Sequence, residues 1–521
     1  MNGTSRSVRR RGHEWLLVSL VFLMALFFQG CASLPKDYPR ESSTAYSEPE
    51  NTGVGRYFAR AAARHPGKSG FGIIRYGREA FTSRVAMSDL AEKTLDVQYY
   101  IWEADATGRI LMERLVRAAE RGVRVRLLLD DINIKGRDAY AVALDAHPNI
   151  EIRMFNPFAN RGKPGLGFLT DFNRVNHRMH NKLMVMDNAL ALVGGRNVGN
   201  HYFNVATDAN FRDLDIAAGG PVVREISSVF DYFWNGEWSF PISVLVDEPA
   251  TEAEMRVVIE QLREQVALDE YPYPLDQDVG ELKSALVSLL DDFVWAPGMI
   301  VWDDPASISE EGSTSKLMEG FAKRLALVED ELLIEIAYFV PREPGIEALA
   351  ALGENGVRVR VLTNSLVSND VLAAHAGYAE RREDLVAAGV ELYELRANPD
   401  SVDKNFVAGS SKAALHTKAV VFDREGVFIG SLNLDPRSLD INTEAGLYVE
   451  SPELAQQVIA YMDSGVTPKN SYRVLLDEDG SLYWITEIDG REVRFDKDPD
   501  STGMQRFVSW FIEILPVEGQ L

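Results

Sequence analysis

The sequence predicts an α/β protein made of two similar lobes, each a mixed β-sheet flanked by helices. One motif, His-x-Lys-x4-Asp, occupies residues 180–187 and again 416–423. A Gly-x-x-Asn turn follows each copy, and the two copies stay in register 236 residues apart. Around both copies, apolar segments of strand length alternate with segments of helix length, which is typical of parallel or mixed sheets. We therefore expect an internal duplication, with a pseudo-twofold axis and one active site shared by the lobes.

The first half of the chain shows this alternation clearly. We expect strands at 95–102, 123–130 and 150–155, where apolar and β-branched residues run together. Helices are expected between them, at 108–121 and 138–146. Strands that are separated by helices of this length favour a sheet with parallel neighbours.

The second half repeats the order. Strands are expected at 332–339, 357–363 and 390–395, and helices at 345–354 and 370–388. Each half also contains the turn Gly-Val-Arg-Val-Arg before its second strand, and the two turns lie 234 residues apart. The duplication therefore extends well beyond the catalytic motif.

Composition and pattern divide the chain into six segments. A leader comes first, and a tether rich in Ser, Pro, Glu and Thr follows it. The expected boundaries are 1–30 for the leader, 31–55 for the tether, 56–240 for the first lobe, 241–310 for a helical connection, 311–465 for the second lobe and 466–521 for the tail.

The tail combines strands with an apolar helix. Asp-Gly pairs separate alternating segments within 472–495, which predicts a three-stranded meander. The last helix, 504–515, carries an apolar stripe formed by Phe507, Val508, Phe511, Ile514 and Leu515. Such a stripe suits either a bilayer surface or the body of the protein. Because the polar face has almost no Lys or Arg, we favour packing against the body.

The charge balance limits the classes of partner. The chain carries a formal net charge of −24. Its 521 residues exceed one ordinary core, so two or more domains are expected, and a hydrophobic content of 46% allows full globular packing. Nucleic-acid binding usually needs a basic face, so the acidic balance argues against a nuclease. It also argues against attachment to anionic lipid through overall charge. Attachment to a membrane would need another source.

The N-terminus supplies such a source. A group of arginines precedes the apolar run 15–28, which is short for a spanning helix. The run leads into Phe-Gln-Gly-Cys, which resembles a bacterial lipoprotein signal that is cleaved before a lipid-bearing cysteine, here Cys31. Cys31 is the only cysteine, so no intrachain disulfide is possible. We expect a periplasm-facing lipoprotein of the bacterial cell envelope, with Ala32 favouring the outer membrane; an uncleaved signal anchor or an ordinary secretory leader is the alternative.

The repeated motif predicts a specific chemistry. The apolar pattern of 179–186 indicates a buried strand, on which His180 and Lys182 point the same way, as do His416 and Lys418. An imidazole serves as nucleophile, acid or base near neutral pH, and an ammonium group is a compact charge that holds a phosphate oxygen. Two such strands facing each other predict phosphodiester transfer, with one histidine attacking phosphorus and the other moving the proton.

Other polar residues complete the predicted site. A histidine in this role needs an anionic partner on its second ring nitrogen, and Asp213 and Glu444 are the candidates, because each opens the strand after its own motif. The turn residues Asn197, Ser431 and Asn433 would bind phosphate oxygens. Lysines and asparagines can stabilise the charge that a metal ion often stabilises, so no metal or other cofactor is expected.

Asp187 and Asp423 complete the two motifs and are counted with the catalytic residues. They lie seven residues beyond the histidines, at the ends of the predicted strands. Aspartates at such positions more often form scaffold ion pairs than take part in catalysis. Both roles therefore stay open for this pair.

The two intact motifs resemble the His-Lys-Asp motif that names the phospholipase D superfamily, and the resemblance covers nearly the whole chain after the leader. It extends to residues 95–102, 121–131, 369–378, 389–395 and 433–438. Within the superfamily these segments are most similar to the bacterial cardiolipin synthases of the C type. The resemblance implies two phospholipase D-like lobes. It also implies transfer of a phosphatidyl group through a phosphohistidine to the glycerol headgroup of phosphatidylglycerol, with phosphatidylethanolamine or phosphatidylglycerol as donor.

Carried over to this chain, the resemblance places the catalytic histidines at His180 and His416, and by family habit the first is the nucleophile. The first turn departs from the family's common Gly-Ser-x-Asn, because it reads Gly-Gly-Arg-Asn. Arg196 is then either a second phosphate ligand or part of a surface ion pair. The loops 159–173 and 398–414, each just before a catalytic motif, are candidates for a headgroup entrance.

Related activities use the same residues. A phospholipase D hydrolase would resolve the phosphohistidine with water and release phosphatidic acid, so hydrolysis is the alternative function. A nuclease of the same superfamily is less favoured, because the chain is acidic and its leader resembles a lipoprotein signal.

Overall fold

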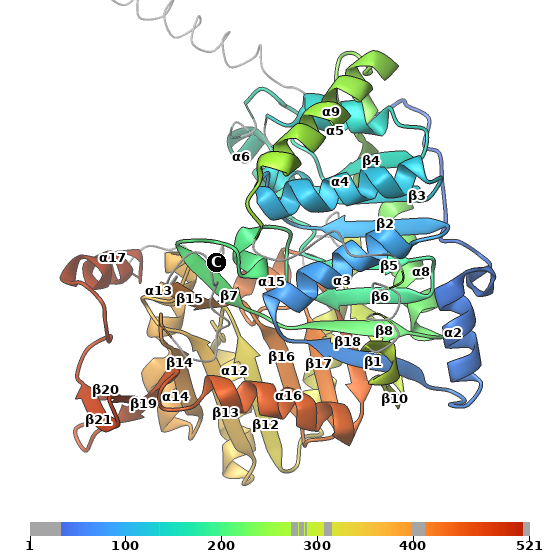
Figure 1. Ribbon diagram of the computed structural model, residues 1–521. Helices are drawn as coiled ribbons and strands as arrows, with labels where there is room; N and C mark the ends of the chain where they lie inside the picture. The colour runs from blue at the N-terminus through green and yellow to red at the C-terminus, as the bar shows by residue number, and fades with distance from the viewer. Residues whose placement is uncertain are drawn as a thin grey trace, which may run out of the picture.

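Two large mixed sheets, one in each half of the chain, form the framework of the protein (Figure 1). The computed structural model describes residues 33–513, apart from 135, 164, 166, 272–279, 281–285, 287, 288, 307–314 and 399–411. Helices flank both sheets, so the predicted α/β class with two similar lobes is confirmed.

The first sheet has nine strands in the described residues. Across the sheet they are β10 (Val294–Ala296), β1 (Ser69–Ile74), β8 (Asp215–Gly219), β6 (Leu190–Gly194), β5 (Leu183–Met186), β2 (Thr94–Tyr99), β3 (Arg124–Asp130), β4 (Ile150–Phe155) and β9 (Ser239–Pro241). The strands β2, β3 and β4 are parallel, and the hairpin β5–β6 continues antiparallel from β2. The catalytic motif thus enters the sheet beside its parallel part.

The second sheet repeats this arrangement. In the described residues its strands are β11 (Gly298–Trp302), β18 (Ala445–Glu450), β17 (Gly426–Gly430), β16 (Lys418–Phe422), β12 (Glu331–Ile336), β13 (Arg358–Asn364), β14 (Glu391–Leu395), β19 (Ser471–Leu476), β20 (Leu482–Ile488) and β21 (Arg491–Phe495). From β11 to β19 the strands match those from β1 to β9 in order and direction. The sequence duplication is therefore also a duplication of sheet topology.

Helices cover the outer faces of the sheets, and a shared core joins the lobes. The outer helices are α3 (Gly77–Leu90), α4 (Ala106–Glu120), α5 (Asp138–Asp145) and α9 (Glu252–Leu268) on the first sheet, and α11 (Lys316–Leu325), α12 (Glu343–Glu354) and α14 (Arg382–Ala387) on the second. Between the lobes, α8 (Val222–Asn235) and α16 (Pro452–Gly465) share one apolar cluster with the inner faces of both sheets. Each fully buried aliphatic side chain there contributes roughly 1.5–3 kcal/mol, so this core holds the lobes in a fixed arrangement.

The segment that we expected to be a tether lies against the first lobe instead. Ser43 N donates a hydrogen bond to Asn235 Oδ1 (3.1 Å), and Ala45 N donates to Asp231 Oδ2 (2.8 Å). Arg126 Nη1 donates in turn to the carbonyl of Ser43 (2.8 Å). Because its backbone polar groups find partners on α8, this part of the segment is fastened to the lobe rather than free.

The connection between the lobes contains strands as well as helix. After α9 it contributes β10 to the first sheet and β11 to the second, and only Pro297 separates the two strands. A proline has no N–H to donate, so it ends the pairing of one strand and lets the chain enter the other sheet. The expectation of a helical connection over 241–310 therefore fits α9 but misses the strands β10 and β11.

Two helices near the C-terminal end also differ from expectation. The single helix predicted at 370–388 is divided into α13 (Leu372–Ala379) and α14, and buried Arg382, at the start of α14, forms an ion pair with Glu394 (2.9 Å). The last helix, α17 (Gly503–Glu513), packs on α13, yet Phe507 and Phe511 are exposed, so its apolar stripe does not face the body as we favoured. Ile514 and Leu515 lie outside the described residues.

Candidate active site

The two catalytic segments bond to the opposite lobe just before their strands begin. We predicted that each histidine lies on a strand, but β5 begins after the first motif lysine and β16 begins at the second. Ahead of these strands, His180 N donates to Thr443 O (2.9 Å) and His416 N donates to Arg212 O (2.8 Å). Next to the second of these bonds, β7 (Ala209–Arg212) and β15 (Lys412–Leu415) pair in parallel across the lobes. The histidines are therefore fixed at the junction of the two lobes.

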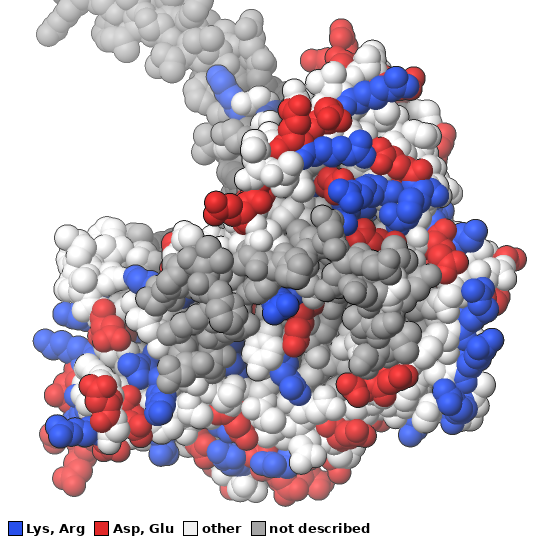
Figure 2. Space-filling model, in the orientation of Figure 1, with Lys and Arg blue, Asp and Glu red and all other residues white. Residues whose placement is uncertain are grey.

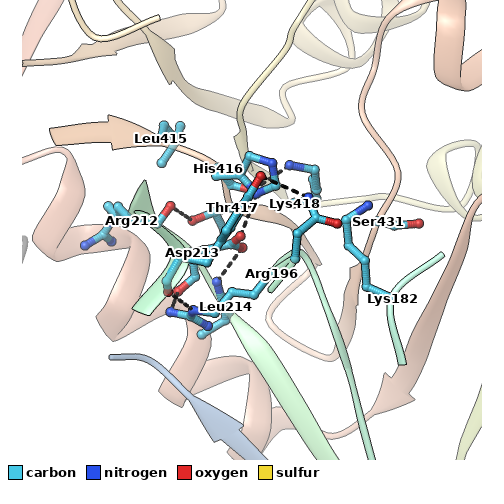
Figure 3. Close-up of polar contacts among 12 residues, drawn as sticks. Lys182, Arg196, Arg212, Asp213, Leu214, Leu415, His416, Thr417, Lys418 and Ser431 are labelled. Carbon is cyan, nitrogen blue, oxygen red and sulfur yellow. Dashed lines mark hydrogen bonds and ion pairs between the residues drawn. The ribbon is translucent and has the colours of Figure 1, made fainter. Parts of the chain in front are cut away.

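Each lobe orients the histidine of the other lobe. His416 Nδ1 lies 2.6 Å from Asp213 Oδ2, and His180 Nδ1 lies 2.9 Å from Glu444 Oε2 (Figure 3 shows the first pair). Both carboxylates are fully buried. A carboxylate at Nδ1 fixes the ring orientation and leaves Nε2 available for chemistry. The structure thus pairs the two orienting candidates with the two histidines across the interface.

The motif lysines lie beside the histidines and are almost completely buried. Lys182 Nζ donates to the carbonyl of His180, and Lys418 Nζ donates to the carbonyl of His416 (2.6 Å). Burial lowers the pKa of both lysines, that of Lys182 well below its ordinary value. An anionic phosphate bound between them would favour their charged forms, so the pair suits a phosphodiester.

The turn residues play unequal parts. Asn197 Oδ1 accepts from Ile101 N (3.1 Å), and its Nδ2 donates to the Tyr202 hydroxyl (3.0 Å), whereas Asn433 Oδ1 is buried and has no hydrogen-bond partner among the described residues. The Ser431 hydroxyl donates to Glu444 instead of standing free for a phosphate. This geometry favours a positioning role for Ser431, and phosphate binding by Asn433 stays a prediction.

The two histidine–carboxylate pairs differ electrostatically. Burial alone would raise the pKa of Asp213, but His416 and nearby cations hold it below its ordinary value. Burial raises the pKa of Glu444 to about 7, although Lys182 acts in the opposite direction. Burial and the two lysines hold the pKa of His180 well below its ordinary value, while the pKa of His416 is lowered by burial and raised in part by Asp213. The site is therefore symmetric in position but not in charge.

The rims of the two half-sites also differ. The Tyr100 ring lies 5.0 Å from the His180 ring and within electrostatic reach of Arg437. In the other half-site, the Tyr338 hydroxyl donates to Asp370 Oδ1 (2.9 Å), and Asp370 is exposed. The cation Arg437 therefore borders the half-site of His180, and the anion Asp370 borders the half-site of His416.

Asp187 and Asp423 lie at hairpin turns, away from the histidines along the strands. Asp187 carboxylate oxygens accept hydrogen bonds from the backbone N–H groups of residues 92–94, and Asp423 accepts from those of residues 329–331. Both aspartates have positive φ, 55° and 50°, as does the residue after each, and they open the three-residue loops that separate the paired ends Met186 and Leu190, and Phe422 and Gly426. The geometry favours the scaffold interpretation over the catalytic one.

Arg196 is neither a phosphate ligand nor part of a surface ion pair. Its guanidinium is buried and donates to the carbonyls of Ile74 (3.2 Å), Arg75 (2.8 Å) and Asp213. It also lies 3.4 Å from Asp215 Oδ2. These bonds use its donors within the first lobe, so Arg196 holds the backbone of Asp213 in place.

Sequence reasoning missed one pair of positioning residues. Asp130 Oδ2 accepts from Met179 N (2.8 Å), and Asn364 Oδ1 accepts from Leu415 N (2.7 Å), so each fixes the residue before a catalytic histidine. Both stand at the ends of the second strands, 234 residues apart, like the Gly-Val-Arg-Val-Arg turns that precede them. That common offset was the signal that could have revealed them.

The structure describes only part of the predicted entrance loops and nothing of the leader. In the first entrance loop, Arg161 forms ion pairs with Asp131 and Asp138, which points to a scaffold role. Most of the second loop, and Cys31 with the leader, lie outside the described residues.

Within the described part of the chain, no helix is long and apolar enough to cross a membrane, and no cluster of His, Cys, Asp and Glu side chains is arranged to hold a metal ion.

Two lobes that each supply a histidine, a lysine and a carboxylate to one site define a two-lobed protein with a phospholipase D-like fold. The structure is similar to that of phosphatidylserine synthase from Haemophilus influenzae Rd KW20, with a TM-score of 0.55 and 16% identity. The similarity covers 89% of this chain and all of the other. At this identity the likeness establishes the fold alone.

The sequence identifies the family. Residues 86–234 and 322–465 match the family described as "Cardiolipin synthase, PLD-like domain". The chain is 38% identical over 471 residues to cardiolipin synthase C of Escherichia coli (strain K12), covering 88% of this chain and 97% of that one. It is 23% identical over 372 residues to a cardiolipin synthase of Clostridium perfringens (strain SM101), covering 71% and 64% of the two chains. The protein belongs to the cardiolipin synthase family of phospholipase D-like phosphatidyltransferases, which confirms the predicted resemblance.

Proposed function

We propose that this enzyme makes cardiolipin by moving a phosphatidyl group through a phosphohistidine to the glycerol headgroup of phosphatidylglycerol. The observation that carries the proposal is that each lobe supplies the carboxylate that orients the histidine of the other lobe. Two oriented histidines and two buried lysines thereby lie at one junction. The donor is phosphatidylethanolamine or phosphatidylglycerol. The name of the Escherichia coli relative supports cardiolipin as the product.

In this proposal His180 is the nucleophile. Its Nε2 lone pair attacks phosphorus, the bond from phosphorus to the headgroup oxygen breaks, and that oxygen takes a proton from His416. In the second step His416 accepts the proton of the glycerol hydroxyl, whose oxygen attacks phosphorus and returns the bonding electrons to His180. The surroundings of His180 support the assignment, because His180 must start neutral and its pKa is held well below the ordinary value. Burial lowers the pKa of His416 as well, and Asp213 acts against that shift, in the direction that an acid needs.

The acidic rim of the second half-site is proposed to receive the headgroup. An attacking and a leaving group lie on opposite sides of phosphorus, so the headgroup lies on the side of His416. Asp370 is on that side, because it bonds to Tyr338 and raises the pKa of both His416 and Lys418. An exposed carboxylate at this point suits the ammonium of an ethanolamine headgroup, which supports phosphatidylethanolamine as donor.

The attachment to the membrane is also proposed. The basic leader, the short apolar run and the single cysteine support cleavage before Cys31 and its acylation. Ala32 then favours an outer-membrane lipoprotein that faces the periplasm. Mass spectrometry of the N-terminal peptide tests this: a diacylglyceryl group on Cys31 supports the anchor, and an intact leader contradicts it.

The central test is lipid mass spectrometry on the purified protein with vesicles of phosphatidylglycerol, alone and mixed with phosphatidylethanolamine. New cardiolipin that disappears in both His180→Ala and His416→Ala supports the proposal, and its dependence on phosphatidylethanolamine identifies the donor. Phosphatidic acid without cardiolipin would establish the hydrolase instead. Degradation of DNA without lipid turnover would point to a nuclease.

A further inference from the structure

The last helix presents an apolar face to solvent. On α17, Met504 is 70% exposed, Phe507 55%, Trp510 53% and Phe511 51%. These four residues are called the aromatic face of α17. Single exposed apolar side chains are ordinary, but a group of large ones on one helix marks a surface for binding something.

The opposite side of α17 packs on the protein. Ser509 is buried, and the contacts of α17 are mainly with α13, so the helix has a fixed seat and its aromatic face points outward. Figure 1 shows α17 beside α13 at one side of the second lobe, and Figure 2 shows the same region as a largely uncharged surface. The aromatic face is therefore exposed although α17 is packed against the protein, and only this face is left for a partner.

The seat of α17 is connected to the rim of the active site, because α17 packs on α13 and α13 follows Asp370 in the chain. Asp370, on the rim of the site, is followed by Val371, which is 41% exposed, and then by α13. In the first lobe, Phe168 and Phe172 are 37% and 42% exposed and stand shortly before His180. Phe168 belongs to α6 (Gly167–Thr170), which Figure 1 shows in the first lobe, whereas α17 lies at the side of the second lobe. Exposed apolar side chains thus occur in both lobes, in segments that lead into the active site.

We propose that the aromatic face of α17, together with Val371, docks on the surface of a lipid bilayer. Trp and Phe are the side chains that enter the boundary between headgroups and acyl chains. The docked enzyme would hold its entrance against the surface that supplies its phospholipids, so the inference rests on the proposed function. A protein partner on the same face would obstruct that supply.

The charge of the chain shapes the kind of contact. With a net charge of −24, the protein as a whole is repelled by anionic lipid. Among the described residues of α17, Arg506 is the only basic one, and it donates hydrogen bonds to Ser501. Docking therefore depends on apolar contact, and salt should not release it.

The first test separates docking from chemistry. The triple variant Phe507→Ser, Trp510→Ser, Phe511→Ser is compared with Leu327→Ser, which removes an even more exposed apolar side chain, 75% accessible, from the turn before β12. The strands β12 and β13 are parallel, so this turn lies at the end where they begin, whereas Asp370 follows the end where β13 stops. We expect the triple variant to lose about tenfold or more of its activity on long-chain vesicles. It should keep its activity on dispersed short-chain phospholipids, and Leu327→Ser should keep both.

The second test observes docking directly, on the full chain with its own N-terminus. Vesicles with brominated acyl chains quench tryptophans that enter the bilayer, so we expect quenching that is lost in Trp510→Phe and persists in high salt. Equal loss of activity on both substrates in the triple variant, or quenching that Trp510→Phe leaves unchanged, would overturn the proposal. A shift from dimer to monomer in the triple variant, with no change in quenching, would assign the face to a second copy of the chain. Trp510 quenching without cardiolipin formation would support docking while rejecting the proposed function.

Discussion

The two half-sites share one backbone design and differ in the charge at their rims. In each lobe the histidine N–H bonds to a carbonyl of the other lobe, and the lysine bonds to the carbonyl of its own histidine. Around them the lobes diverge: Arg437 lies near Tyr100 in one half-site, whereas Asp370 accepts from Tyr338 in the other. The comparison teaches that duplication supplied a symmetric backbone frame for the two histidines and lysines, and that divergence gave the two halves different charge.

The strongest test of this asymmetry compares His180→Ala with His416→Ala. Both should lose about 10³-fold or more of cardiolipin synthesis, because each removes an essential group. With a phosphatidyl donor whose leaving group is p-nitrophenol, which departs without a proton, His416→Ala should still release one nitrophenol per enzyme in a burst. His180→Ala should show no burst. Rapid-mixing absorbance measures this, and the opposite pattern would reverse the two roles.

The next effect concerns the two orienting carboxylates and pH. Because the pKa of Glu444 is raised to about 7, this group is protonated at lower pH and then cannot stabilise positive charge on His180. We expect kcat/KM to fall as pH drops through about 7, and Glu444→Gln to lose that dependence along with roughly 10²-fold of its rate at higher pH. Asp213→Asn should slow the enzyme but keep the acid limb, since the pKa of Asp213 is below its ordinary value. An unchanged acid limb in Glu444→Gln would contradict this assignment.

A smaller effect is expected at the acidic rim. Asp370→Asn should lower kcat/KM about tenfold with phosphatidylethanolamine as donor and less with phosphatidylglycerol, because only the first headgroup carries an ammonium. Tyr338→Phe, which removes the bond that holds Asp370, should give a partial loss in the same direction. Asp479→Asn, at an exposed turn of the tail, serves as the control. The measurement is donor-specific release of ethanolamine or glycerol, and equal losses for both donors would remove the headgroup role.

The smallest effect on activity should come from the motif aspartates. Asp187→Asn and Asp423→Asn keep the positive φ of the turn but weaken three hydrogen bonds to backbone N–H groups. We expect a loss of about 1–3 kcal/mol in the free energy of unfolding for the buried Asp187 and less for the partly exposed Asp423. Thermal unfolding and rate per folded molecule measure the two effects. A large loss of rate without a change in stability would restore the catalytic role.

Much of the fold was predictable because its signals are local. Alternating apolar segments located the strands β2, β3 and β4 and their counterparts, and the spacing of the motif located both histidines and lysines. The aspartates illustrate the limit of such signals. Their distance from the histidines marked them as strand ends, but only the hairpin geometry showed that their oxygens serve the backbone of a neighbouring strand.

Arg196 and α17 show where local patterns mislead. A charged residue beside the site suggested a phosphate ligand, yet burial directed Arg196 to carbonyl groups of its own lobe. In α17 the sequence shows one apolar stripe, but the small Ser509 lets the helix approach α13 on another side. Which face of a helix becomes buried depends on the shape of the partner surface, which a single segment does not contain.

By itself, the sequence determined the duplication, the order of the repeated strands and helices and the family, and it predicted the histidine and lysine chemistry. Only the tertiary structure decided that Asp213 serves His416 and that Glu444 serves His180, across separations of 203 and 264 residues. It also decided which half-site carries the anionic rim and which face of α17 stays exposed. These contacts form because the two sheets pack through one shared core, and the packing of distant surfaces is not written in the spacing of neighbouring residues.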